Sequence, residues 1–161
     1  IIVGPKEFTI SCINLKEVLY TIKKNKYIFL SRGDDSGTHK KEKELWGLLN
    51  FNPKIFSNWY KMIGQGMGGT LMMANEIKAF TLTDRSTWIS YNNKKNLKII
   101  CENNPSLLNQ YGIIPVNPKI NANINYSIAD IYIKWIISEK GKELINNFKK
   151  NGQNLFIFNY N

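Results

Sequence analysis

The stretch YIFLSRGDDSGTHKKEKELW, residues 27–46, decides the fold class. It opens with a short apolar and aromatic run, residues 27–30, which is typical of a buried strand. A helix then begins at Ser36 or Gly37 and runs to about Leu49, with apolar residues available for a core. A buried strand that leads through a short polar loop into a helix predicts an α/β fold.

The rest of the chain alternates in the same way. Apolar runs predict strands, and apolar residues at helical spacing behind a capping residue predict helices. The expected strands are residues 1–3, 58–63, 79–83, 97–101 and 112–116, and the expected helices are residues 14–24, 70–77, 86–90, 126–138 and 139–149. Asn14 and Asp84 are expected to cap the helices of residues 14–24 and 86–90, and the last two helices divide at or just before Gly141. We therefore expect helices layered on a mainly parallel or mixed sheet.

Length and composition narrow the class of protein. A chain of 161 residues fits one domain or two small lobes, and 43% hydrophobic residues are enough to form a core. The longest apolar run, residues 131–137, contains Lys134 and is too short to span a bilayer. The chain opens on IIVGPKE, without an initiator Met or a basic leader, so we expect its start to be processed or cut from a longer protein.

The net charge of +10 does not by itself indicate a nucleic-acid partner. The lysines lie in dispersed groups beside acidic or polar neighbours, which is typical of solvated helix faces. Only two of the 22 basic residues are arginines, Arg32 and Arg85. In a chain that uses Lys almost everywhere, an Arg suggests a need for the planar fork that an ammonium group lacks.

Cysteine and histidine give little support for other chemistry. Cys12 and Cys101 have neither CxxC spacing nor a neighbouring His, so two buried thiols are favoured over a disulfide. Because His39 is the only histidine, a metal site and a Ser-His-Asp triad are both disfavoured, and no catalytic residue is predicted. Tyr132 and Trp135 lie at helical spacing and are expected in the core.

The loop SRGDDSGTH, residues 31–39, has the properties of an anion site. It lies where the carboxyl end of a buried strand meets a helix, the edge at which open α/β folds bind ligands. Free N–H groups at Ser36, Gly37 and Thr38 favour an anion, and the missing Cβ of Gly37 allows close approach. Arg32 can donate to two oxygens at once.

The competing interpretation of this loop is purely structural. In that case Asp35 or Ser36 only caps the helix, and Arg32 pairs with Asp34. Capping alone requires neither a glycine nor four polar side chains together, so anion binding is favoured.

A second segment, GQGMGG at residues 64–69, fits the G-x-G-x-x-G pattern of dinucleotide-binding loops, with Asp84 lying 20 residues after Gly64. Its place in the middle of the chain and the short helix that follows favour a tight turn instead, or a wall of the anion site that includes Gly66. In TLTDRS, residues 81–86, Asp84 is expected to cap a turn and Arg85 to pair with a carboxylate, in preference to direct ligand contact.

Several segments together resemble the tungstate-binding protein (TupA) family of tungstate and molybdate importers. They are FLSRGDDSGTHKKEKELW, WYKMIGQGMGGTLMMANE, AFTLTDRSTW, LLNQYGIIPVNP and the closing AxxxxxWIIS with LF, which occur in this order from about Tyr27 to Phe156. The resemblance implies an α/β fold of the type II periplasmic-binding-protein class, whose two lobes close on the ligand. This chain would hold one complete lobe, residues 5–105, with the oxyanion loop, and the C-terminal part of the other lobe, residues 106–161.

The resemblance also implies a function and a set of contacts. The chain would be the solute-binding component of an ABC importer, not an enzyme, outside the cytoplasmic membrane. Tungstate or molybdate would be its ligand and the membrane permease its partner, without a cofactor, a metal or nucleic acid. Arg32 and Thr38 would contact the oxyanion, with Ser36 and Gly37 beside them. The supporting residues would be Ser31, Asp34, Gly66, Asp84 and Arg85.

Two alternatives stay open. Phosphate-binding proteins of the same superfamily share the order Arg-x-Asp-x-Ser-Gly-Thr, which residues 32–38 also match, so phosphate or sulfate is the second candidate ligand. A carboxylate facing the ligand suits protonated phosphate and repels fully ionised tungstate; with tungstate, Asp34 should therefore orient Arg32 instead of touching the ligand. A nucleotide-dependent enzyme that uses residues 64–69 is the third candidate.

Members of the resembled family also carry a segment before the one that matches IIVGP. It includes a Thr/Ser-rich loop that supplies the other half of the site, and this chain is expected to lack it.

Overall fold

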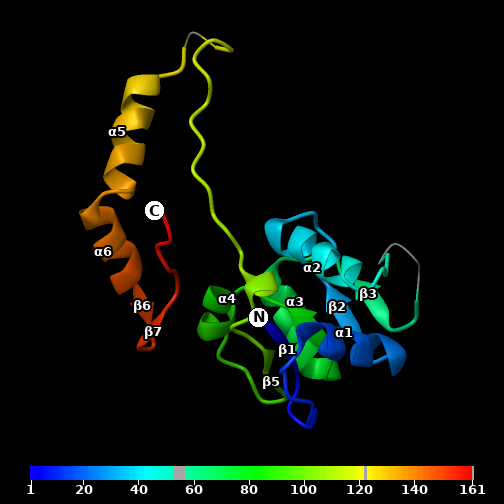
Figure 1. Cartoon of the computed structure of the whole chain (residues 1–161). Helices are drawn as coiled ribbons and strands as arrows, with labels where there is room; N and C mark the ends of the chain where they lie inside the picture. The colour runs from blue at the N-terminus through cyan, green and yellow to red at the C-terminus, as the bar shows by residue number, and fades with distance from the viewer. Residues whose placement is uncertain (53–56, 122, 161) are drawn as a thin grey trace. The chain divides into compact units, whose positions relative to one another are not determined.

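The computed structural model describes residues 1–52, 57–121 and 123–160 (Figure 1). The chain divides into two compact units, Ile1–Asn109 and Gln110–Asn161. The first unit holds a five-stranded sheet, and the second holds two helices and a two-stranded ribbon. Within the described ranges, no helix combines the length and apolar character needed to cross a membrane.

The sheet of the first unit is mixed. Its strands are β1 (Ile2–Pro5), β2 (Phe29–Ser31), β3 (Tyr60–Met62), β4 (Phe80–Leu82) and β5 (Leu97–Cys101), in the order β3-β2-β4-β1-β5. β2 is parallel to both β3 and β4, whereas β1 lies antiparallel between β4 and β5. The prediction of a mainly parallel or mixed sheet is confirmed.

Helices cover both faces of this sheet. On one face, α1 (Leu15–Lys24) and α2 (Gly37–Gly47) share an apolar cluster with Phe29. On the other, α3 (Met67–Ile77) and α4 (Arg85–Ser90) share a cluster with Leu30. Phe29 and Leu30 are consecutive in β2, and successive side chains of a strand point to opposite faces. The first unit is therefore a three-layered α/β structure, as the sequence predicts.

The predicted helix caps are present. Asn14 accepts a hydrogen bond from the amide of Lys16 at 2.9 Å and begins α1, and Asp84 accepts one from the amide of Thr87 at 2.7 Å and begins α4. These local bonds satisfy amides that have no partner inside the helix, and they fix where each helix starts.

The expectation of two free thiols is wrong. Cys12, in the loop between β1 and α1, forms a disulfide with Cys101 at the end of β5, and their Cα atoms lie 5.1 Å apart. The two residues are 89 positions apart in the chain, so the sheet and not the local sequence brings them together.

The second unit contains α5 (Tyr126–Ile136), α6 (Glu139–Asn147) and the ribbon of β6 (Lys149–Lys150) and β7 (Gln153–Asn154). As predicted, the helices divide just before Gly141, with Ser138 as the cap of α6. A Cβ added at Gly141 would lie 2.1 Å from the carbonyl oxygen of Ile136. Gly141 is therefore required where α6 approaches the end of α5.

Two expectations for the second unit are wrong. Tyr132 and Trp135 are 50% and 47% exposed, and α5, all of which is described, contains no buried residue. Residues 112–116 form no strand, and Ile114 is 87% exposed. An apolar run becomes a strand only where a neighbouring strand pairs with its backbone, and no partner is recorded for this segment within the described residues.

Candidate functional site

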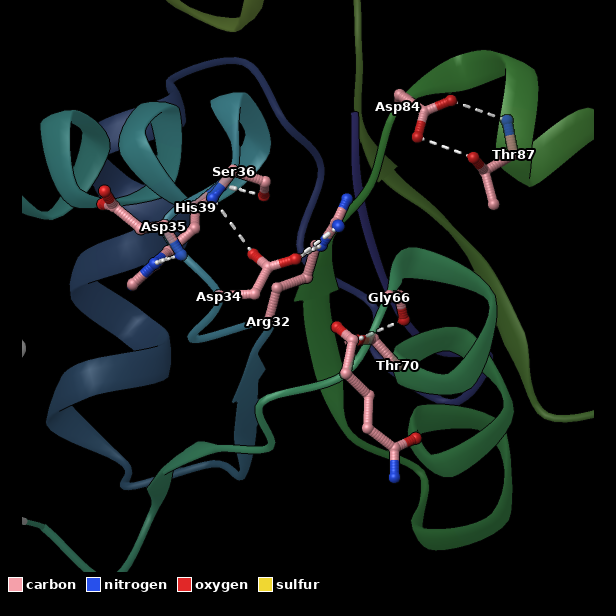
Figure 2. A network of polar contacts seen from close by, with 10 residues as sticks. Arg32, Asp34, Asp35, Ser36, His39, Gly66, Thr70, Asp84 and Thr87 are labelled. Carbon is pink, nitrogen blue, oxygen red and sulfur yellow. Dashed lines mark hydrogen bonds and ion pairs between the residues drawn. The ribbon is translucent and has the colours of Figure 1, made fainter.

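Three polar loops meet at one edge of the sheet. The parallel strands β2, β3 and β4 end at the same edge, and each leads within a few residues to the start of a helix: α2, α3 and α4 respectively. Helix N-termini carry unpaired N–H groups and a partial positive charge, so their convergence creates a favourable environment for an anion. Figure 2 shows the polar side chains gathered at this edge.

Arg32 and Asp34 form the central ion pair of the site. The guanidinium of Arg32 donates from Nε at 3.0 Å and from Nη2 at 2.5 Å to the same oxygen, Oδ2, of Asp34. The other oxygen, Oδ1, accepts a hydrogen bond from the amide of Ser36 at 3.2 Å. Desolvation raises the pKa of Asp34, but the hydrogen bonds from Ser36 and Arg32 outweigh it and hold that pKa at about 2. Asp34 is therefore ionised and committed to orienting Arg32.

The loop around this pair has an unusual backbone that His39 supports. Gly33 and Asp35 have φ angles of 65° and 57°, in the left-handed region that costs most residues free energy. The amide of Asp35 donates to Nδ1 of the buried His39 at 2.9 Å, which ties the loop to α2. Desolvation, with help from Lys43, lowers the pKa of His39, so the ring stays neutral and its nitrogen remains an acceptor at neutral pH.

The start of α2 presents the donors that an anion requires. Ser36 is the cap residue, and its hydroxyl accepts from the amide of His39 at 3.3 Å. The amides of Gly37 and Thr38 form no hydrogen bond with the described residues. Space around Gly37 is open, since nothing lies within 4 Å of the position that a Cβ would take. These amides are thus available to a ligand that approaches along the helix axis.

The glycine-rich segment forms the start of α3. Gly66 caps this helix without a side-chain hydrogen bond, and Gly64 and Gly68 border open space. The hydroxyl of Thr70 donates to the carbonyl of Gly66 at 3.1 Å, which stabilises the turn from within the helix (Figure 2). The helix begins three residues earlier than predicted, because the glycine turn itself supplies its first residues.

Asp84 and Arg85 have structural partners. The carboxylate of Asp84 accepts from both the amide and the hydroxyl of Thr87 (Figure 2). It also accepts from the hydroxyl of Ser86, so its oxygens serve α4. Arg85 pairs with Glu102. Both interactions agree with the preferred expectation for these residues, a cap and a carboxylate pair.

Two residues beneath the site, Glu42 and Tyr60, were not predicted from the sequence. Glu42 is only 3% exposed on α2, and the hydroxyl of Tyr60 in β3 donates to its Oε1 at 2.5 Å. Ser31, expected as a supporting residue, is fully buried beside them and faces away from solvent. The signal for Glu42 in the sequence was a charged residue at a position on the core face of an amphipathic helix. This signal is hard to recognise because the helix is rich in Lys and Glu. Among the described residues, no group of His, Cys, Asp and Glu side chains could hold a metal ion.

A family model described as a PBP superfamily domain matches residues 2–140. The chain belongs to the PBP superfamily. The tungstate-binding protein TupA of Peptoclostridium acidaminophilum is 46% identical over 132 residues, which are 82% of this chain and 46% of that protein. TupA of Campylobacter jejuni is 45% identical over 148 residues, 89% of this chain and 55% of that protein. The resemblance to the TupA family, drawn above from sequence motifs, is confirmed.

Solved structures agree with the sequence relatives. The tungstate-binding protein TupA of Desulfovibrio alaskensis G20 superposes with a TM-score of 0.87 at 36% identity, covering 100% of this chain and 67% of that one. The tungstate ABC transporter structure from Geobacter sulfurreducens gives a TM-score of 0.77 at 37% identity, covering 92% and 63%. The α/β fold of this superfamily is therefore confirmed, and the chain spans about half the length of the curated relatives it matches.

Proposed function

We propose that this chain is the solute-binding component of an ABC importer and that it captures tungstate or molybdate. The observation that carries the proposal is the Arg32–Asp34 pair beside the amides of Gly37 and Thr38, which have no hydrogen-bond partner among the described residues. Such a site supplies donors and positive charge, as a dianion that has only acceptors requires. The relatives named for tungstate binding share this part of the chain.

The state of Asp34 favours a fully ionised ligand over phosphate. Both carboxylate oxygens of Asp34 accept from groups of its own loop, Oδ2 from Arg32 and Oδ1 from Ser36. A protonated phosphate is best recognised by a carboxylate that is free to accept its O–H. Because Asp34 turns toward Arg32, its role matches the expectation for tungstate, in which it orients the guanidinium without touching the ligand.

We infer further that the chain works outside the cytoplasmic membrane, with a membrane permease as partner. The disulfide between Cys12 and Cys101 supports an oxidising compartment, where such bonds persist. In this proposal residues 5–105 form the lobe with the oxyanion loop, and residues 106–161 contribute to the second lobe. The protein releases its ligand unchanged, so no catalytic residue is assigned.

Calorimetric titration with tungstate, molybdate, sulfate and phosphate tests the proposal. We expect tungstate and molybdate to bind more tightly than phosphate, and Arg32→Ala to abolish binding. Arg32→Lys keeps the charge but removes the fork, so it should bind at least about tenfold more weakly than the wild type. Lys16→Ala, an equal loss of charge on the exposed surface of α1, is the control and should bind as the wild type does. Absence of binding to all four anions would refute the proposal for this chain.

A further inference from the structure

Glu42 is a carboxyl group buried directly beneath the oxyanion site. It lies on α2, five residues after Gly37, so it is about 7.5 Å along the helix axis from the helix start. Only 3% of the residue is exposed, and its Oε1 accepts a hydrogen bond from the hydroxyl of the buried Tyr60 at 2.5 Å. The contact joins α2 to β3, which is paired with β2, the strand that ends immediately before Arg32.

The other neighbours of Glu42 are polar but neutral. The Ser31 hydroxyl and the Trp46 indole N–H lie close enough to influence its ionisation, yet neither has a hydrogen bond of ordinary geometry with any described residue. The charged group recorded as acting on Glu42 is Lys43, which is partly exposed and paired with Asp35. No cation among the described residues forms a salt bridge with Glu42.

A buried carboxyl without a cation is most stable in its neutral form. Burial raises the pKa of Glu42 to about 7, against the opposite influence of the donors on Tyr60, Ser31 and Trp46. Burial and the neighbouring Glu42 also raise the pKa of Tyr60 above its ordinary value, so Tyr60 keeps its proton and remains a donor. The neutral acid has a proton of its own to donate, and the unpartnered Ser31 hydroxyl is a suitable acceptor.

The charge of Glu42 matters to the site because the two share a helix. The start of α2 attracts anions through its partial positive charge. A negative charge fixed inside the same helix, in a poorly screened environment, opposes that attraction and repels a dianion directly. The neutral acid leaves the attraction intact and still holds α2 against the strands that carry Ser31 and Tyr60.

We propose that Glu42 is a positioning residue of the oxyanion site that acts as a neutral acid, and that capture of the anion is coupled to a proton held on this residue. The proposal rests on the proposed function, since it requires that an oxyanion binds at the start of α2. By linkage, a bound dianion increases the affinity of Glu42 for its proton. The protein therefore takes up a proton when the anion binds above pH 7.

Other titrating groups near Glu42 change outside that pH range. The pKa of His39, one turn earlier on α2, is lowered from 6.5, so this ring is already neutral above pH 7. The pKa values of Asp34 and Asp35 are lowered, and that of Tyr60 is raised. Lys43 is the charged group that acts on Glu42 from α2, and the protonated Tyr60 is the ionisable group that donates to it from β3. Among these groups, Glu42 is therefore the one whose charge changes between pH 7 and 9.

Tungstate titration calorimetry of the whole chain at pH 7, 8 and 9 tests the coupling. We expect the dissociation constant of the wild type to increase with pH, by up to about tenfold per unit. Titrations in buffers of different ionisation enthalpy should show proton uptake. Glu42→Gln is neutral at every pH and nearly isosteric, so it should bind at pH 9 as tightly as at pH 7, without proton uptake. Glu44→Gln removes an exposed carboxylate from the same helix and should retain the wild-type pH dependence.

Tyr60→Phe gives an independent check. It removes the donor that favours the ionised form of Glu42, so the loss of affinity should begin at a higher pH than in the wild type. Wild-type binding that does not change between pH 7 and 9, or a pH dependence that persists in Glu42→Gln, would overturn the inference while leaving the proposed function intact. If no oxyanion binds at any of these pH values, the proposed function fails and the inference fails with it.

Discussion

Reduction of the Cys12–Cys101 disulfide should lower the free energy of unfolding of the first unit by about 4.6 kcal/mol. Both cysteines belong to residues 1–109, and the bond closes a loop across a sequence separation of 89. In the chain-entropy treatment, a cross-link across a loop of this length lowers the entropy of the unfolded chain by about 15.5 cal/mol/K, equivalent to about 4.6 kcal/mol at 25 °C. A domain of this size has a total stability of about 5–15 kcal/mol, so the loss is a large fraction of it.

Urea unfolding, followed by far-UV circular dichroism with and without dithiothreitol, measures this loss. The transition of the reduced protein should move to lower urea, and its slope should increase, because an unfolded chain without the cross-link exposes more surface. The Cys12→Ser, Cys101→Ser double variant is the control: it should match the reduced protein and show no response to dithiothreitol. An unchanged midpoint after verified reduction would refute this reasoning, since it would mean that the bond contributes nothing to the stability of the sheet.

Three further predictions concern single residues. The pKa of Glu42 in the folded state is about 7, above its ordinary value of 4.5, so between pH 4.5 and 7 the folded state holds a proton that the unfolded state has released. The free energy of unfolding should therefore decrease by up to about 3 kcal/mol as pH rises from 4.5 to 7. Glu42→Gln should remove this slope in urea unfolding at pH 5 and pH 8; an equal slope in the variant would argue that Glu42 is not the titrating group. In the Glu42→Gln variant, stability should instead decrease as pH falls below 6.5, because the pKa of His39 is lowered in the folded state and the unfolded state therefore binds a proton more readily. Adding His39→Leu should abolish that decrease, as measured by thermal unfolding at pH 5 and pH 7. Gly4→Ala would place a Cβ 2.4 Å from the ring of the buried Phe80 and should destabilise the protein by about 1–3 kcal/mol. Gly37→Ala places its Cβ in open space, so it should leave the midpoint of thermal unfolding unchanged while weakening tungstate binding.

The local features of this protein follow from short stretches of its sequence. Asn14, Ser36 and Asp84 begin helices because each side chain bonds to an amide two or three residues ahead, an interaction that needs no distant partner. Alternation of apolar runs with helical spacing was sufficient to predict a layered α/β fold. The loop of residues 31–39 was also recognisable, because its donors and its glycine lie within nine consecutive positions.

Other features depend on contacts between distant segments. The tryptophan-bearing face of α5 matches the pattern of a buried helix, yet Trp135 is half exposed, since periodicity shows which residues share a face but not what covers that face. Residues 112–116 are apolar enough for a strand, but they lack a backbone to pair with among the described residues.

The sequence by itself determined the fold class, the capped starts of α1, α2 and α4, and the polar loop of residues 31–39, because these depend on the chemistry of neighbouring residues. Only the tertiary structure decided that Cys12 meets Cys101, that β1 lies antiparallel between β4 and β5, and that Tyr60 reaches Glu42. Each of these contacts joins residues separated by many positions, and their proximity is fixed by how strands pair and helices pack. The charge state of Glu42 belongs to the same group, since its pKa is set by burial and not by the residues beside it in the chain.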